Sequence, residues 1–283
     1  MKTYTIISKN NFKITVNEFS PSVSNEKTIV FAPAVGVPQK FYFNIAKALQ
    51  DKGCHVFTFD YRGIGASKPK ELSSIKNYGF FSWASDFNSV SKYVKEKLPN
   101  NTQYLIGHSF GGNSLGFSDA YQYYDKYLTI GSQFGYYKNF RFITRKLILL
   151  NFKFFVPLTT KLMGYYPSSW FGLGNALPSK AATDWASYLL EPESMLYLTK
   201  VHQTSYYDKI TNPMLLVSIE DDTFAPEKTV DLLGSKIYSK AQVQRKHLTP
   251  KEYNLKAIGH FDFFRKKNEK ILWPLVYDWF ELN

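Results

Sequence analysis

Short, continuous runs of apolar residues recur along the chain, and segments with helical spacing of apolar residues lie between them. The apolar runs predict strands that are covered on both faces. They are residues 28–32, 55–60, 104–107, 128–131, 214–219 and 253–258. Two alternating segments, residues 4–8 and 12–19, precede them and predict a hairpin. Helices are expected over residues 38–52, 82–98, 110–124, 227–238 and 263–280, the last of them kinked or split at Pro274.

Strands that alternate with helices indicate an α/β fold, with a mostly parallel sheet of about eight strands and helices on both faces. Reactive residues in such a fold lie in loops beyond the carboxyl ends of the strands. The pattern changes over residues 134–207, which are aromatic and basic and contain no apolar run of strand length. We therefore expect a core formed by residues 1–133 and 208–283, with a mainly helical insertion, residues 134–207, after the sixth strand. Residues 239–252 are interpreted as a basic loop.

The run at 104–107 leads into Gly107-His108-Ser109-Phe110-Gly111, the pattern G-x-S-x-G between a strand and a helix. Such a nucleophile elbow holds a serine on a sharp, strained turn that exposes its hydroxyl. Side chains two positions before and after the serine would collide with the neighbouring strand and helix, so glycine is required there. The pattern alone also fits an ordinary glycine-rich turn. The assignment of Ser109 as a nucleophile therefore depends on an acid and a histidine later in the chain.

Both partners follow. A serine hydroxyl needs an adjacent base that is oriented by a carboxylate, and in this fold their chain order is serine, acid, histidine. Asp222 is the predicted acid, because it follows the run at 214–219 and stands just before Pro226, where a helix can begin; Asp221 is its rival. His260 is the predicted base, because it follows the last apolar run and a glycine.

An oxyanion hole requires backbone N–H donors that point at developing negative charge. We predict the amide of Phe110, at the start of the elbow helix, and that of Val35, with Ala34 as the next choice, in the loop after the first parallel strand. Residues 60–67 contain glycines but neither the complete dinucleotide pattern nor a Walker lysine. No metal-ligand spacing is present, so neither a cofactor nor a metal is predicted.

Composition narrows the class of protein. The chain has 283 residues, 44% of them hydrophobic, which is typical of a globular protein. The formal charge of +12 comes from scattered residues, mostly lysine, without a nucleic-acid-binding signature, so no nucleic-acid partner is expected. The single cysteine, Cys54, excludes an internal disulfide. The first residues lack the features of a signal peptide, and the most apolar window, 147–158, is too short and polar to cross a bilayer, so we expect a cytoplasmic protein.

These segments together resemble the serine hydrolases of the α/β-hydrolase superfamily, and most closely its lysophospholipase-like and serine-aminopeptidase-like predicted hydrolases. The sequence of residues 258–265 is similar to that of an uncharacterised bacterial group. The resemblance is carried by residues 33–36, 60–67, 107–112, 222–226 and 259–260. It implies the α/β-hydrolase fold with a helical lid. It also implies a serine that is acylated by the substrate, after which water releases the acid. These roles correspond to Ser109, His260 and Asp222. Many members have His-Gly in the oxyanion loop where this chain has Pro33-Ala34, and the insertion resembles no lid that we can assign.

The function that this resemblance implies is hydrolysis of a medium-chain or lipid-like carboxylic ester. The first alternative is an amide or peptide hydrolase of the serine aminopeptidase type, which requires a carboxylate to hold a substrate ammonium. The candidates for that carboxylate in the insertion are Asp184, Glu191 and Glu193. A binding protein that has this fold without catalysis is the second alternative.

The insertion supplies candidate substrate contacts. Its aromatic side chains are expected to line an apolar cavity, and we select Phe134, Trp170, Phe171 and Trp185 as substrate-binding residues. The other aromatic candidates are Tyr136, Tyr137, Phe152, Phe154 and Phe155. Basic residues among them suggest weak contact with anionic lipid headgroups. These are Lys138, Arg141, Arg145, Lys146, Lys153 and Lys161. The sequence makes no prediction of oligomeric state.

Overall fold

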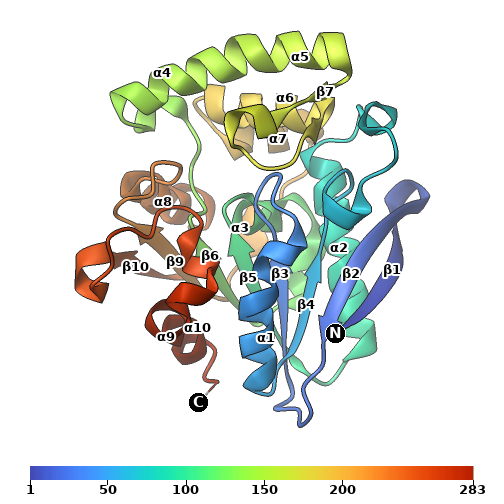
Figure 1. Ribbon diagram of the computed structural model, residues 1–283, viewed down its shortest axis with the longest axis vertical. Helices are drawn as coiled ribbons and strands as arrows, with labels where there is room; N and C mark the ends of the chain where they lie inside the picture. Colours follow the sequence, from blue (N-terminus) through green and yellow to red (C-terminus); the bar gives the residue numbers. More distant parts are fainter. Residues whose placement is uncertain (283) are drawn as a thin grey trace.

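Eight strands form one sheet in the order β1-β2-β4-β3-β5-β6-β9-β10 (Figure 1). The computed structural model describes residues 1–282. The strands are β1 (Lys2–Ser8), β2 (Phe12–Phe19), β3 (Lys27–Ala32), β4 (His55–Phe59), β5 (Thr102–His108), β6 (Lys126–Ile130), β9 (Pro213–Ile219) and β10 (Gln242–Leu248). β2 pairs antiparallel with both β1 and β4, and every other neighbouring pair is parallel. The predicted α/β fold with a mostly parallel sheet is confirmed.

Helices cover both faces of the sheet and bury two apolar cores. One core contains residues of α1 (Phe43–Asp51), α9 (Glu269–Leu272) and α10 (Pro274–Trp279). The other contains residues of α2 (Phe80–Lys97) and α8 (Glu227–Leu232). In α2 the side chains of Trp83, Phe87, Val90 and Val94 recur every three or four residues and are fully buried. Each such side chain contributes roughly 1.5–3 kcal/mol by leaving water, so this face fixes α2 against the sheet.

The last strand differs from the sequence prediction. β10 lies inside the segment interpreted as a basic loop, whereas residues 253–258 form no strand. β10 is an edge strand that pairs only with β9, and exposure alternates along it. It therefore lacks the continuous apolar run that marks a strand buried on both faces. A 3₁₀ turn at Pro250–Tyr253 and a left-handed Asn254, with φ of 53°, occupy the position of the expected strand.

The elbow helix is also shorter than predicted. α3 covers only Phe110–Asn113, and two 3₁₀ segments, Ser114–Phe117 and Asp119–Tyr123, follow it. Ser118 separates these segments in an extended conformation, and its hydroxyl accepts a hydrogen bond from the Ala120 amide. A serine that caps a new turn in this way competes with continuation of a helix.

The segment between β6 and β9 adds no strand to the main sheet and lies over its upper end in Figure 1. Its helices are α4 (Phe142–Leu150), α5 (Val156–Met163), α6 (Ser179–Leu190) and α7 (Met195–His202), and its only strands are the two-residue pair β7 (Tyr165–Tyr166) and β8 (Leu177–Pro178). A π-helical turn, Asn151–Phe155, joins α4 to α5, so that the two form one long rod across the top of the molecule. Phe152 on this turn packs edge-on against Trp185 of α6, with ring centroids 5.0 Å apart.

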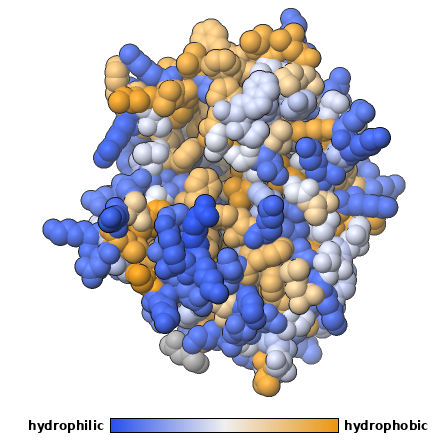
Figure 2. All heavy atoms as spheres, in the orientation of Figure 1, coloured by the Kyte–Doolittle hydropathy of each residue, from blue (hydrophilic) through white to orange (hydrophobic). Residues whose placement is uncertain are grey.

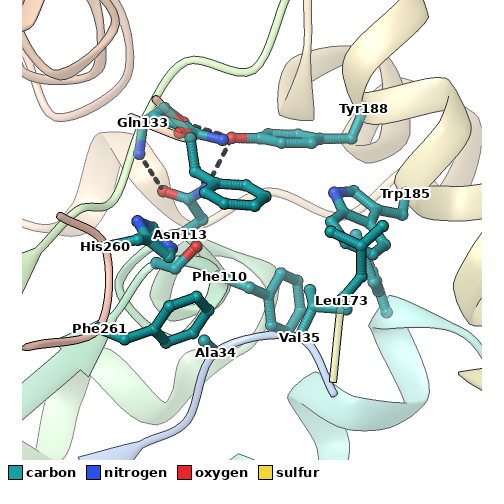
Figure 3. Close-up of a pocket in the computed structure, with 13 residues that line it drawn as sticks. Ala34, Val35, Phe110, Asn113, Gln133, Leu173, Trp185, Tyr188, His260 and Phe261 are labelled. Carbon is teal, nitrogen blue, oxygen red and sulfur yellow. Dashed lines mark hydrogen bonds between the residues drawn. The ribbon is translucent and has the colours of Figure 1, made fainter. Parts of the chain in front are cut away.

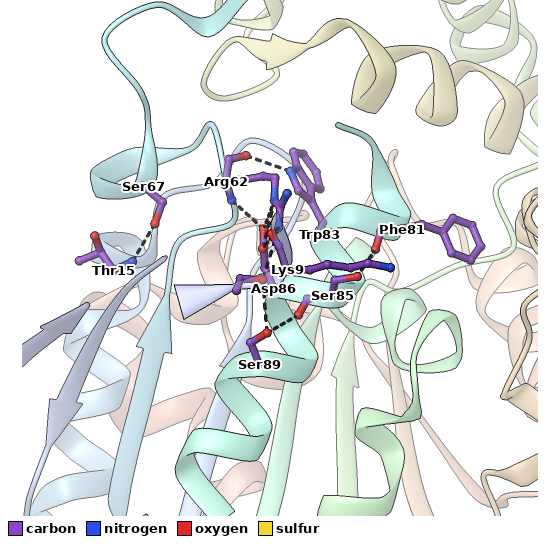
Figure 4. A network of polar contacts seen from close by, with 10 residues as sticks. Lys9, Thr15, Arg62, Ser67, Phe81, Trp83, Ser85, Asp86 and Ser89 are labelled. Atoms are coloured by element: carbon purple, nitrogen blue, oxygen red, sulfur yellow. Dashed lines mark hydrogen bonds and ion pairs between the residues drawn. The ribbon is translucent and has the colours of Figure 1, made fainter. Parts of the chain in front are cut away.

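A buried ion pair fixes the loop that follows β4 (Figure 4). The Arg62 guanidinium donates to both carboxylate oxygens of Asp86 on α2 at 2.6–3.1 Å, and the Arg62 amide also donates to Asp86. The rings of Phe12 and Tyr78 lie 4.9 and 4.7 Å from the guanidinium carbon, and Trp83 Nε1–H donates to the Arg62 carbonyl. Arg62 is thus held by a carboxylate, two rings and an indole of the protein itself, which indicates that this loop is a structural turn.

Candidate active site

Ser109 lies at the sharp turn between β5 and α3. Its backbone has φ of 51° and ψ of −117°, a strained conformation for a residue with a side chain. The turn is held because the Ser109 amide donates to the Ile130 carbonyl at 2.9 Å, and the Ser132 hydroxyl donates to the Ser109 carbonyl at 2.7 Å. A Cβ on Gly111 would lie 1.8 Å from the Ala32 carbonyl oxygen. The glycine of the motif is therefore required by the close approach of β3.

His260 lies in the loop after β10 and forms a hydrogen bond with Asp222, which lies in the loop after β9. The distance from His260 Nδ1 to Asp222 Oδ2 is 2.7 Å, and both residues are buried. The other oxygen of Asp222 accepts the amides of Phe224 and Ala225 at 2.8 and 2.9 Å. A carboxylate only accepts, so the Nδ1 proton of His260 is directed at Asp222 and Nε2 is left free to accept a proton.

The neighbouring carboxylate has a different contact. Asp221 accepts the amides of Ile258 and Gly259 at 2.9 and 2.8 Å, and thereby holds the backbone just before His260. Of the two acids that the sequence offers, Asp222 is the one on the imidazole, and Asp221 anchors the loop that carries it.

His108, next to Ser109 in the elbow, connects three parts of the site through buried hydrogen bonds. The Ala34 amide donates to the Tyr42 hydroxyl at 3.1 Å, and this hydroxyl lies 2.8 Å from His108 Nδ1. His108 Nε2 lies 2.9 Å from the carbonyl oxygen of His260. Because a carbonyl can only accept, Nε2 carries the proton and Nδ1 accepts from Tyr42. Complete burial, aided by the nearby His260, lowers the pKa of His108 well below its usual 6.5, so the ring is neutral.

The same contacts bear on the predicted oxyanion hole. The Ala34 amide is occupied by Tyr42. Among residues 1–282, the amides of Val35 and Phe110 have no hydrogen-bond acceptor, and both residues border the pocket that contains Ser109. The Phe110 amide is also the first of α3, where N–H groups have no partner within a helix.

Ser109 and His260 line one small pocket of about 50 Å³. Within the described residues, no hydrogen bond joins the Ser109 hydroxyl to the His260 ring. Figure 3 shows His260 and Phe261 on one side of the pocket, with Trp185 and Leu173 of the insertion on the other. The insertion therefore forms one wall of the space that the elbow opens into.

A larger apolar chamber of about 360 Å³ adjoins this pocket inside the insertion. Gln133, Leu173, Trp185 and Phe224 border both spaces. The remaining lining of the chamber comes mainly from the α4–α5 rod and from α6. The chamber and the pocket of Ser109 are therefore direct neighbours, and Trp185 lies on the boundary of both.

The predicted substrate residues fall in different places. Trp185 lines the pocket and the chamber, and Phe171 lines the chamber. Phe134 and Trp170 line neither, which corrects the expectation for these two residues. Phe134 is buried in the core with Lys236 over its ring, and Trp170 is 70% exposed on the outside.

Sequence reasoning missed a polar cluster on the pocket wall (Figure 3). The Asn113 side chain donates to the Tyr188 hydroxyl at 2.9 Å and to the Gln133 carbonyl at 3.2 Å. The Oε1 atom of Gln133 is buried, and no donor reaches it within residues 1–282. Asn113 lies four residues after Ser109, one helical turn along the chain, and this spacing is the signal that places it beside the nucleophile.

The candidates for binding a substrate ammonium lie elsewhere. Asp184 is buried, pairs with Lys180 and accepts the Phe80 amide at 2.9 Å. Glu193 pairs with Lys200. None of the three candidates, Asp184, Glu191 and Glu193, borders the pocket or the chamber. In residues 1–282, no group of three histidine, cysteine, aspartate or glutamate side chains is arranged to hold a metal ion.

The comparisons with known proteins agree with this fold. A family model described as the alpha/beta hydrolase fold matches residues 33–115, from the oxyanion loop through the elbow. No curated protein matches the chain in sequence.

Solved structures with the same fold match over nearly the whole chain. The esterase EaEST from Exiguobacterium antarcticum is 17% identical with a TM-score of 0.60, and the match covers 97% of this chain and 98% of that one. A hydrolase from Oleispira antarctica is 17% identical with a TM-score of 0.61, over 95% of this chain and 94% of that one. A putative hydrolase from Agrobacterium vitis is 12% identical with a TM-score of 0.62, over 98% of both chains. The strand order, the elbow and these matches together show that the chain has the α/β-hydrolase fold.

Proposed function

We propose that the protein is a serine hydrolase that cleaves carboxylic esters with an apolar acyl chain. The observation that carries the proposal is the convergence on one pocket of a strained serine, a histidine oriented by a buried carboxylate, and two unpaired amides. Acyl transfer needs these groups at one point: a nucleophile, a base with a fixed tautomer, and donors for the oxyanion.

In the proposed reaction, His260 Nε2 takes the hydroxyl proton of Ser109 while Oγ bonds to the ester carbonyl carbon. The amides of Val35 and Phe110 stabilise the resulting oxyanion, and Asp222 stabilises the imidazolium. His260 then returns the proton to the leaving alcohol as the C–O bond breaks, which leaves an acyl-serine. Water repeats the sequence: it gives a proton to His260, its oxygen bonds to the acyl carbon, and the carboxylic acid leaves as Ser109 regains its proton. Ser109 and His260 come into hydrogen-bond contact in this proposal when substrate binds, since catalytic contacts often tighten only in the complex.

The preference for an ester with an apolar acyl chain rests on the chamber. Its walls are mainly aliphatic and aromatic side chains, and it adjoins the pocket of Ser109 at Trp185, which lines both spaces. Each methylene that leaves water contributes about 0.8 kcal/mol, or roughly a fourfold gain in kcat/KM, as long as the chamber has room. The aminopeptidase alternative has no comparable support, because the insertion carboxylates do not border this space.

A fluorophosphonate probe tests the chemistry. We expect it to label the wild type and to fail with Ser109→Ala. Ser194→Ala is the matched control, because Ser194 has nearly the same backbone conformation, φ 54° and ψ −124°, but is fully buried. This variant should keep its labelling. A wild type that does not react, or a Ser109→Ala variant that still does, contradicts the proposal.

Substrate class is then measured with p-nitrophenyl esters of increasing acyl length and with aminoacyl p-nitroanilides. The expected result is turnover of the esters, with kcat/KM rising with chain length before it levels off. Turnover confined to the anilides would replace ester hydrolysis with the amide alternative.

A further inference from the structure

The α4–α5 rod carries a stripe of exposed apolar side chains along its outer face. They are Ile143, Leu147, Leu150, Phe154, Leu158 and Leu162, each half or more exposed. They recur every three or four residues, so they lie on one side of the rod. Phe142, next to Ile143 in the chain, is 66% exposed and adds to this surface. Figure 2 shows apolar residues gathered along the top of the molecule, where Figure 1 places this rod. We call this set the outer stripe.

The outer stripe is not the margin of the apolar core. The rod already has a buried face, formed by Ile148, Phe152, Val156 and Thr159. The outer stripe lies on the other side. A surface helix normally has one apolar face towards the core and a polar face towards water. An apolar patch of this size on a protein surface marks a contact with another apolar body.

The charge of the residues around the outer stripe indicates which kind of partner can bind there. The sequence contains no aspartate or glutamate between Asp125 and Asp184. The rod and its approach carry six basic residues, Lys138, Arg141, Arg145, Lys146, Lys153 and Lys161. None of them pairs with a carboxylate among residues 1–282. A second copy of the chain would bring these like charges together, whereas a membrane with anionic lipids offers both an apolar interior and negative headgroups.

The chamber opens on the same face. Leu147, Leu150, Phe155 and Phe171 line the chamber and are also exposed to solvent. A partner that covers the outer stripe therefore also covers the exposed part of the chamber wall, and the chamber adjoins the pocket of Ser109. No helix among residues 1–282 is long and apolar enough to cross a membrane.

We propose that the α4–α5 rod docks in the plane of an anionic membrane surface, with the outer stripe among the acyl chains and the lysines at the headgroups. Docking of this kind would let an acyl chain pass from the bilayer into the chamber without crossing water. Only this last consequence rests on the proposed function, since the docking itself requires no catalysis.

Vesicle flotation tests the docking. Full-length protein is mixed with phosphatidylcholine vesicles, with or without phosphatidylglycerol, and the bound fraction is measured at low and high salt. We expect binding that requires phosphatidylglycerol and weakens as salt screens the headgroups. Ser109→Ala should bind like the wild type, so that a failure of the proposed chemistry leaves this result intact.

Two variants examine the two parts of the surface. The triple variant Lys146→Glu, Lys153→Glu, Lys161→Glu should lower the partition coefficient by on the order of a hundredfold or more, because each lysine near an anionic surface contributes about fivefold. The variant Ile143→Ser, Phe154→Ser, Leu162→Ser should lower it at least about tenfold, through lost apolar burial. These three residues do not line the chamber, so ester turnover in solution should persist.

Control variants carry changes of the same kind outside the insertion. Lys240→Glu, Lys251→Glu, Lys256→Glu changes net charge equally, and Ile7→Ser with Val23→Ser removes exposed apolar side chains outside the insertion. Both controls should bind vesicles like the wild type. The proposal is overturned if the wild type does not bind anionic vesicles, or if the controls lose binding as strongly as the rod variants. It is also overturned if analytical ultracentrifugation shows a dimer that the stripe variant converts to monomer, because the stripe would then be a protein interface.

Discussion

Replacing His108 with phenylalanine should reveal how much the buried hydrogen-bond path between Tyr42 and His260 contributes. Phenylalanine keeps a ring among the aromatic neighbours of His108, including Phe41 and Phe264. It removes both hydrogen bonds of the imidazole, so the Tyr42 hydroxyl loses its acceptor and the His260 carbonyl loses its donor.

The loss of stability follows from these two unpaired groups. Each buried polar group without a partner costs about 1–3 kcal/mol, so His108→Phe should lower the free energy of unfolding by about 2–6 kcal/mol. Equilibrium urea unfolding, followed by tryptophan fluorescence, measures this directly. Tyr42→Phe should give a smaller loss that is not additive with the first, because both variants break the same hydrogen bond.

The difference in the free energy of unfolding between wild type and His108→Phe should also depend on pH. Burial lowers the pKa of His108 well below 6.5 in the folded protein, whereas the unfolded chain takes up the proton near 6.5. Stability from the neutral ring is therefore complete above this value and is lost as the pH falls below it. From about pH 7.5 to about pH 5.5, wild type should lose about 1.4 kcal/mol more than His108→Phe, and the gap between the two should narrow by that amount. The other four histidines are common to both proteins and cancel.

Two results would refute this reasoning. A gap that stays constant over this pH range would mean that His108 titrates normally in the folded state. A variant as stable as wild type at neutral pH would mean that the two hydrogen bonds contribute nothing net.

Three further changes have expected outcomes. Asp86→Asn should lower the free energy of unfolding by about 3–5 kcal/mol in urea titrations, because the buried guanidinium of Arg62 loses its counter-charge; near-wild-type stability would contradict the structural role of this pair. Gly111→Ala should abolish cooperative thermal unfolding and fluorophosphonate labelling, since its Cβ would lie 1.8 Å from the Ala32 carbonyl oxygen; a labelled, folded variant would show that the strand can retreat. Trp185→Ala should shift the preferred acyl chain to greater length in the ester series, because it widens the passage to the chamber; an unchanged preference would place the acyl chain elsewhere.

The sequence identifies the elbow because steric constraints there are local. Gly107 and Gly111 are needed within a few residues of Ser109, so the pattern can be read without knowing the fold. The contacts of His108 are different, because Tyr42 and His260 lie 66 and 152 residues away along the chain. The choice between Asp221 and Asp222 likewise depends on which carboxylate faces the imidazole, and chain order is the same for both.

The edge of the sheet shows a second limit of prediction from the sequence. Inner strands such as β9 are covered on both faces, so their apolar runs predict them correctly. β10 is an edge strand, and it carries Arg245 at a position where an inner strand would carry an aliphatic residue. The Arg245 guanidinium donates to Asp231 and to the backbone of β9. The α4–α5 rod shows the opposite difficulty. Apolar residues lie on both of its sides, so the sequence does not indicate which side is buried.

The hydrogen bond from the Gly135 amide to the buried hydroxyl of Ser194, 2.9 Å long, fastens the beginning of the insertion to a point near its end. An insertion exchanged between those two residues would therefore have both of its ends at one place on the scaffold. It would also have to reproduce its other contacts with the core, because the Phe80 amide donates to Asp184 and the Asn113 side chain donates to Tyr188. We expect a grafted insertion to fold on a related scaffold only where these partner positions are kept.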